Sequence, residues 1–129
     1  MSGYDLSAET IDGIELVSVT LSGPASLDGI IGLLRELEAR RPSRVLIDES
    51  GLRAGFVSPG QIRQIADEWR KAAAVRAARI AVFTPNLVIY GLNRMFQGWA
   101  DAGDRVAVFT DRAAATAWLL ERGSETSPQ

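Results

Sequence analysis

Two nearly identical segments constrain the fold of this chain more than any other feature of its sequence. The chain reads RIAVFT at 79–84 and RVAVFT at 105–110, 26 residues later. Each segment has the β-branched and aromatic character of a buried strand, and each is followed by a pattern typical of a helix. The spacing therefore predicts one β-α unit used twice in succession, with SRVLID at 43–48 as a looser third instance.

The N-terminal part of the chain predicts a β-hairpin. Residues 4–11 place apolar side chains at every second position, as in a half-buried edge strand. Asp12-Gly13 follows, and this pair favours a two-residue hairpin turn because both residues tolerate positive φ. The returning strand is IELVSVTL at 14–21, and Gly23-Pro24 ends it.

Four helices are expected between and after these strands. Ser26 and Ser58 have the positions of N-cap residues, and Gln61 completes the spacing of a capping box with Ser58. Thr84 and Thr110 stand where the repeated strands stop, so we predict that they cap the last two helices.

The fold class predicted from this order is α/β. A single domain over residues 1–123 should contain a five-stranded mixed sheet that starts with the hairpin and continues with β-α units and four helices. The last residues, 124–129, read as a polar C-terminal tail.

The composition excludes several classes of function. The chain has no Cys and no His, which removes thiolate nucleophiles, the commonest metal ligand and the usual general base. We therefore expect no metal, no cofactor and no enzymatic activity. A formal net charge of −2 gives no attraction to nucleic acid. Since the sequence shows neither a membrane span nor a secretory signal, a cytoplasmic location is expected.

The same order of elements resembles the STAS superfamily, and more closely the small bacterial SpoIIAA-like proteins. The resemblance covers residues 4–120 and is carried by RVLIDESGL, IAVFTPNLVIYGLNRMFQ and RVAVFTDRAAATAWL. It implies a five-stranded mixed sheet with four helices. In the anti-sigma-factor antagonists of this superfamily, a serine in the loop after the central strand is phosphorylated by a partner kinase.

The resemblance implies that Ser58 is the position of such a phosphorylation or switch. The matching stretch here is VSPG, in which Ser58 and Gly60 agree with the Asp-Ser-Ser-Gly pattern of the antagonists. Val57 stands in place of the aspartate, and Pro59 replaces the second serine.

Polar side chains gather where the predicted parallel strands end, the edge at which open α/β sheets commonly bind ligands. Asp48 is interpreted as a loop-capping carboxylate, and its neighbour Glu49 should point to the opposite face of the strand. Thr84 could also line a ligand-binding edge together with Thr110. The residues expected at this edge are Asp48, Ser50, Ser58, Thr84, Asn86, Thr110 and Asp111.

The helix predicted at 86–101 carries more apolar residues than one buried stripe needs. The stripe itself consists of Val88, Leu92, Met95, Phe96 and Trp99, and Leu87, Ile89 and Tyr90 extend the apolar character around the first turns. Such a surplus indicates a homodimer contact or a pocket for an apolar or lipid-like ligand. Arg94 on this helix would bind an anionic head group or form a surface ion pair.

Trp118 is predicted to anchor the last helix in the core.

Four basic residues lie close together in the sequence without interleaved aromatic residues, so we interpret them as a solvated face. They are Arg70, Lys71, Arg76 and Arg79.

Three functions from different classes remain open. The first is a non-enzymatic regulatory or protein-interaction module that acts through a surface around Ser58 and the 86–101 helix, with a protein partner or a second copy of the chain. The second is a carrier of a small apolar or lipid-like ligand, with Tyr90, Arg94 and Phe96 beside its pocket. The third, an enzyme that relies on Asp48 or Glu49, is ranked last.

Overall fold

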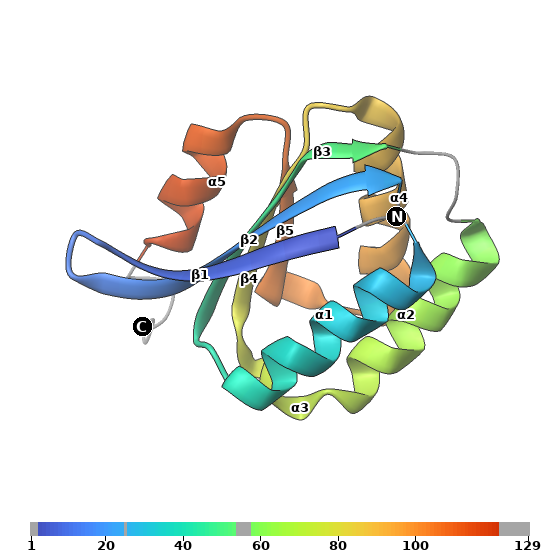
Figure 1. Ribbon diagram of the computed structural model, residues 1–129, viewed down its shortest axis with the longest axis horizontal. Coiled ribbons are helices and arrows are strands. Elements are labelled where there is room, and N and C mark those ends of the chain that lie inside the picture. Colours follow the sequence, from blue (N-terminus) through green and yellow to red (C-terminus); the bar gives the residue numbers. More distant parts are fainter. Residues whose placement is uncertain (1–2, 25, 54–57, 122–129) are drawn as a thin grey trace.

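The computed structural model of the protein describes residues 3–24, 26–53 and 58–121 (Figure 1). Five strands form one sheet in the order β1-β2-β3-β4-β5. The predicted tail at 124–129 and the predicted end of the domain at 122–123 lie outside the described residues. The elements are β1 (Gly3–Ile11), β2 (Ile14–Pro24), α1 (Leu27–Arg40), β3 (Arg44–Arg53), α2 (Pro59–Lys71), α3 (Ala73–Ala77), β4 (Arg79–Phe83), α4 (Leu87–Ala100), the 3-10 turn η1 (Gly103–Arg105), β5 (Val106–Phe109) and α5 (Arg112–Leu119).

A two-residue turn joins β1 to β2. Asp12 and Gly13 have φ values of 52° and 78°, and positive φ at both central positions defines the turn type that suits the twist of a hairpin. Ile11 pairs with Ile14 across the turn, and the antiparallel pairing continues along both strands. The predicted hairpin is therefore confirmed.

The two repeated segments become neighbouring parallel strands. Ile80 of β4 pairs with Val106 of β5, and Phe83 pairs with Phe109. The pairs β2-β3 and β3-β4 are also parallel, whereas β1 and β2 are antiparallel. The predicted five-stranded mixed sheet and its β-α units are confirmed.

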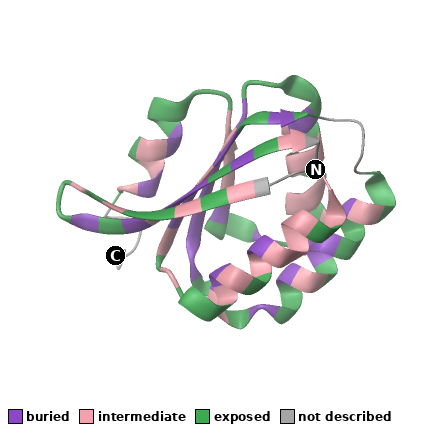
Figure 2. Ribbon diagram, viewed as in Figure 1, coloured by how far each residue is buried: buried purple, intermediate pink, exposed green. Residues whose placement is uncertain are grey.

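The sheet has two faces that are covered unequally. On one face, α1, α2, α3 and α4 enclose the larger core, in which Val19 and Val45 are fully buried and Leu37 is 1% exposed. On the other face, α5 packs on a smaller core that includes Leu16 and Leu119. In Figure 1, α5 lies to the left of the sheet and the other helices lie to the right and below. Figure 2 shows buried positions along the central strands and exposed positions on the outer turns of the helices.

The structure contains one more helix than predicted. The helix predicted to begin at Ser58 is divided in two, because Ala72 has φ −95° and ψ 83°, which separates α2 from the short α3. This break turns Val75 into the larger core, where it is fully buried. The carboxylate of Glu38 on α1 accepts hydrogen bonds from the Ala74 and Val75 amides at 2.9 and 3.1 Å, so the new helix start is satisfied. Within the described ranges, no helix is long and apolar enough to cross a membrane.

The strand β3 is longer than predicted, because Asp48 does not end it. Thr20 of β2 pairs with Asp48, but Ser22 pairs with Gly51, so β3 contains one extra residue at this point. Such a β-bulge changes the face to which the following side chains point. Residues 51–53 therefore continue the sheet beside the end of β2.

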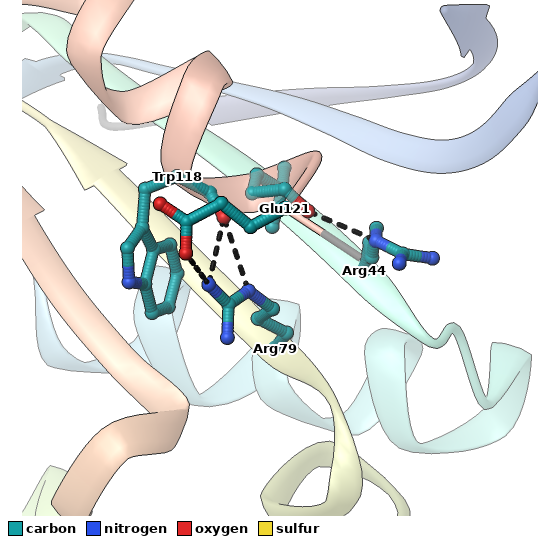
Figure 3. A network of polar contacts seen from close by, with 5 residues as sticks. Arg44, Arg79, Trp118 and Glu121 are labelled. Carbon is teal, nitrogen blue, oxygen red and sulfur yellow. Dashed lines mark hydrogen bonds and ion pairs between the residues drawn. The ribbon is translucent and has the colours of Figure 1, made fainter. Parts of the chain in front are cut away.

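Arginine side chains hold the end of α5 against the sheet (Figure 3). Arg79 of β4 donates through Nη2 and Nε to the Trp118 carbonyl oxygen at 2.8 and 3.2 Å, and its guanidinium lies 3.8 Å from the centre of the Trp118 ring. Arg44 of β3 donates to the Leu119 carbonyl at 2.9 Å. These bonds satisfy carbonyl groups that the end of a helix leaves open. The interpretation of Arg79 as part of a solvated face is wrong, since the residue is only 7% exposed.

Candidate functional site

An apolar cavity of about 110 Å³ lies between the sheet and the helices α1, α2 and α4. Its wall on the sheet includes Ile47 and Val82, and the helices contribute Leu33, Ile65 and Phe96 among others. An engineered cavity of roughly 150 Å³ with a similar aliphatic and aromatic lining binds benzene. The present cavity is smaller than that one, so its volume restricts an occupant to a compact apolar molecule.

Helix α4 forms one wall of this cavity, but its orientation differs from the predicted one. Ile89, Leu92 and Phe96 line the cavity at the spacing of one helix face. Val88, which was predicted on the buried stripe, is 63% exposed, whereas Ile89 is 3% exposed. The prediction is wrong by one position because the first turns of α4 are apolar on every side, so periodicity alone does not define their inner face.

A carboxyl group reaches the cavity from β3. Glu49 is 8% exposed, and its Oε1 accepts a hydrogen bond of 2.7 Å from Asn93 Nδ2 on α4. Asn93 Nδ2 also donates to the Ile89 carbonyl at 3.1 Å, which fixes the amide in place. Glu49 and Asn93 are therefore a polar pair that crosses from the sheet to α4 within an apolar lining.

The surroundings of Glu49 favour its neutral form. Burial raises the pKa of the Glu49 carboxyl to about 7, and the negative charge of the adjacent Asp48 acts in the same direction. The hydrogen bond from Asn93 opposes this shift because it stabilises the charged form. The group consequently exchanges its proton near neutral pH.

Trp69 of α2 also belongs to the cavity wall. The residue is 5% exposed, and its ring packs edge-on against Phe96 with the ring centres 5.9 Å apart. Its indole Nε1 is buried, and no acceptor for it occurs in the part of the chain that the structure describes. A buried donor without a partner is rare in folded proteins.

Asp48 lies on the other face of the sheet and does not share the site of Glu49. Its Oδ1 accepts from the Ser50 amide at 2.9 Å and from the Ser50 hydroxyl at 2.6 Å, and its Oδ2 pairs with Arg112 of α5. The two adjacent carboxylates therefore have different partners on opposite faces, as expected of strand neighbours. Among residues 3–24, 26–53 and 58–121, no group of three or more acidic side chains could hold a metal ion.

The helices that follow the repeated strands begin later than predicted. Asn86 caps α4 by accepting from the Val88 and Ile89 amides, and Asp111 caps α5 by accepting from the Ala114 amide. Thr84 is not a cap; its Oγ1 accepts from the Asn86 amide, and the residue is fully buried. Thr84 therefore does not line an accessible edge. The caps therefore lie two residues after Thr84 and one residue after Thr110.

Ser58 has the local geometry that its sequence context predicted. Its hydroxyl accepts from the Gln61 amide at 3.2 Å, and the Gln61 side chain accepts from the Ser58 amide at 2.8 Å. This reciprocal pair is a capping box at the start of α2, on an exposed part of the surface. The use of Ser58 as a phosphorylation site remains a prediction.

Replacing Ser58 by alanine should lower the free energy of unfolding by about 1 kcal/mol, because the Gln61 amide loses its acceptor. Ser58→Asp is the matched control: a carboxylate caps a helix equally well and suits its dipole, so stability should stay near that of the wild type. Urea denaturation of the three proteins measures both effects. Equal stability of the alanine variant and the wild type would show that the cap contributes nothing.

The remaining predicted residues of the helix at 86–101 lie in different places. Phe96 lines the cavity, whereas Tyr90 and Arg94 do not; Tyr90 is half-buried and Arg94 is exposed. Arg94 forms no ion pair with any residue that the structure describes. Leu87 and Val88, at the start of α4, are 74% and 63% exposed.

Sequence reasoning did not bring together the residues of this cavity. Glu49 was considered only as the neighbour of Asp48 and as its alternative in an enzyme, and neither Asn93 nor Trp69 was among the predicted site residues. A signal for Asn93 was present, since it interrupts the apolar face formed by Ile89, Leu92 and Phe96. Nothing in the sequence indicates that Glu49 lies opposite that asparagine.

The fold resembles two solved structures over most of its length, although no family profile and no curated protein matches the chain. The first is an uncharacterised DUF3478 protein with a SpoIIAA-like fold from Shewanella loihica PV-4, with a TM-score of 0.62 and 13% identity over 92% of this chain and 95% of that one. The second is an anti-sigma factor antagonist from Mycobacterium paratuberculosis, with a TM-score of 0.54 and 14% identity over 92% and 96% of the two chains. At such identities the likeness concerns the fold, which is SpoIIAA-like.

Proposed function

We propose that this chain, which has a SpoIIAA-like fold, is a non-enzymatic module that binds a small apolar molecule between its sheet and the helices α1, α2 and α4. The cavity of about 110 Å³ carries this proposal. It lies within the larger core, and its lining is aliphatic and aromatic apart from the polar side chains of Glu49 and Asn93. A concave apolar site with few polar groups is the usual form of a small-molecule site.

A binding role fits this arrangement better than catalysis. General acid-base chemistry commonly uses two groups that exchange protons on opposite sides of a substrate, but Glu49 is the sole ionisable side chain among the described residues that line the cavity. Its partner Asn93 does not titrate. Asp48, the other acidic residue considered, points to the opposite face and is paired with Arg112.

Binding of toluene tests this proposal. In methyl-labelled protein, toluene should shift the NMR signals of Leu33 and Ile65, which line the cavity, and leave those of Leu16 and Leu119, on the other face, unchanged. The variant Ile65→Phe, which extends a ring into the cavity, should lose the response. If toluene moves the signals of both faces equally, or of neither, the cavity is not a binding site.

A second candidate function is a regulatory protein-interaction module of STAS type, supported by the likeness to an anti-sigma factor antagonist. The exposed Leu87 and Val88 at the start of α4 would then contact a protein partner or a second copy of the chain. This role is compatible with a bound ligand, since α4 forms both the cavity wall and the exposed apolar turn.

A further inference from the structure

The carboxyl group of Glu49 has one oxygen that is bonded within the protein and one that is open. Oε1 accepts from Asn93 Nδ2 at 2.7 Å, whereas no described residue donates to Oε2. The enclosed side-chain atoms that lack a partner in the described part of the chain are Trp69 Nε1 and Gln97 Oε1, so Glu49 Oε2 is not enclosed. Because Glu49 and Asn93 both line the cavity, their bonded groups lie at its wall, and a molecule in the cavity can contact the open oxygen.

The surroundings of this carboxyl favour its uncharged form. Helices α1, α2 and α4 and strands β2, β4 and β5 contribute only uncharged side chains to the described wall. The bonded partner, the Asn93 amide, is also uncharged. The adjacent Asp48 is negative and is paired with Arg112 on the other face of the sheet. A carboxylate without a counter-charge is costly in an apolar wall, so Glu49 retains its proton there.

The retained proton makes Oε2 a hydrogen-bond donor. A neutral carboxylic acid has one O–H group, and Oε1 already accepts from Asn93, so the proton belongs to Oε2. A buried donor costs free energy unless it finds an acceptor. Apart from Asn93, the side chains of the described wall offer no acceptor. A molecule that carries an acceptor would therefore gain a hydrogen bond on entering the cavity.

The same wall restricts the charge of the occupant. No lysine or arginine occurs among the described residues that line the cavity, so an anion would be buried without a counter-charge. An ammonium group would bring three N–H donors, for which the wall offers only the side-chain oxygens of Glu49 and Asn93. A carbonyl or ether oxygen needs a single donor, which Oε2 supplies.

We infer that the occupant of the cavity is a compact, uncharged molecule whose carbonyl or ether oxygen accepts a hydrogen bond from the protonated carboxyl of Glu49. This inference rests on the proposed function, since it specifies the chemistry of the molecule in the same cavity. It also couples binding to the proton on Glu49, because the ionised carboxylate has no donor to offer.

Cyclopentanone and benzene test the inference, because they have the same number of non-hydrogen atoms and only the ketone has an oxygen acceptor. Their dissociation constants would be measured by NMR titration of the wild type, Glu49→Gln and Glu49→Leu. Glutamine keeps a donor at this position through its side-chain amide, whereas leucine has none. The preference for cyclopentanone over benzene should persist in Glu49→Gln and fall by roughly threefold to tenfold in Glu49→Leu, as expected for one net hydrogen bond.

The dependence of binding on pH shows whether the donor is a protonated carboxyl. Burial raises the pKa of Glu49 to about 7, so the protonated fraction of the wild type falls steeply between about pH 6 and pH 8. The apparent dissociation constant of cyclopentanone should rise by roughly tenfold over this range, since only the protonated fraction offers the donor. Glu49→Gln should show no such rise. Asp48→Asn, the matched control, removes the neighbouring acid on the other face and should keep the rise.

Three results would each overturn the inference: an unchanged preference in Glu49→Leu, a dissociation constant of cyclopentanone that does not vary with pH, or tighter binding of cyclopentylamine than of cyclopentanone. The proposed function would still stand in each case if benzene binds and shifts the signals of Leu33 and Ile65. Failure of every compound to bind would reject both.

Discussion

Replacing Trp118 by alanine should lower the free energy of unfolding by about 3 kcal/mol, at the lower end of the range for buried tryptophans because the ring is half-buried. The ring covers the guanidinium of Arg79 and contacts Phe109, with the ring centres 5.8 Å apart. Its removal leaves a gap beside the smaller core and takes the aromatic face away from an arginine that is 7% exposed. Urea denaturation followed by circular dichroism measures the change.

Trp118→Phe provides the control for this prediction. Phenylalanine keeps an aromatic face for Arg79 and part of the contact with Phe109, so its cost should be less than half that of alanine. The hydrogen bonds from Arg79 reach the main-chain carbonyl of residue 118, which both variants retain. If the alanine variant changes stability by no more than about 0.5 kcal/mol, the usual range for surface positions, then α5 is not anchored through this ring.

Replacing Glu49 by glutamine should remove a pH-dependent loss of stability. The difference in free energy of unfolding between Glu49→Gln and the wild type should grow by roughly 3 kcal/mol as the pH rises, which corresponds to a pKa raised from 4.5 to about 7. Glutamine has nearly the same shape but carries no titrating proton. The measurement is the free energy of unfolding of both proteins across this pH range. Their difference isolates Glu49, because the two proteins share every other titrating group.

The direction follows from proton binding. With its pKa raised by burial, Glu49 holds a proton in the folded state at pH values where the unfolded chain has released it. Below about pH 4.5 both states carry the proton and Glu49 adds no penalty. Between that pH and about 7 the wild type loses stability relative to Glu49→Gln, and above 7 the full penalty remains.

A second variant, Glu49→Leu, checks that the carboxyl group itself is responsible. Both variants should remove the same pH-dependent term, although their stabilities at any one pH will differ because leucine leaves Asn93 Nδ2 without one acceptor. A difference between wild type and Glu49→Gln that stays constant with pH would show that Glu49 ionises as freely in the folded protein as in the unfolded chain.

The position of Glu49 links the fold to the candidate site. The bulge in β3 lies between the pairs Thr20–Asp48 and Ser22–Gly51, so the sheet adds a residue where Glu49 meets α4. Ile47, Glu49 and Leu52 consequently all line the cavity, although simple alternation would have turned residue 52 to the other face. An irregularity of the main chain thus builds part of the cavity wall.

Much of the fold could be predicted from short segments. The Asp12-Gly13 turn, the Ser26 and Ser58 caps and the strands of the repeat were all expected, because each depends on backbone preferences and apolar spacing among residues close in sequence. Errors arose where local signals conflict or are uniform. Thr84 and Asn86 are both residue types that favour a cap, and only Asn86 fills this role; the uniformly apolar start of α4 concealed which of Val88 and Ile89 faces inward.

The residues of the candidate site could not be predicted from short segments of the sequence. By itself the sequence determined the α/β order, the hairpin and the starts of α1 and α2, since these require only contacts within a few residues. The tertiary structure alone decided that Glu49 lies opposite Asn93, 44 residues away, and that Arg79 is stacked against Trp118, 39 residues away. The physical reason is that the burial of a side chain, its pKa and its hydrogen-bond partners depend on every group that surrounds it. Those groups come from strands and helices that meet only when the sheet is assembled.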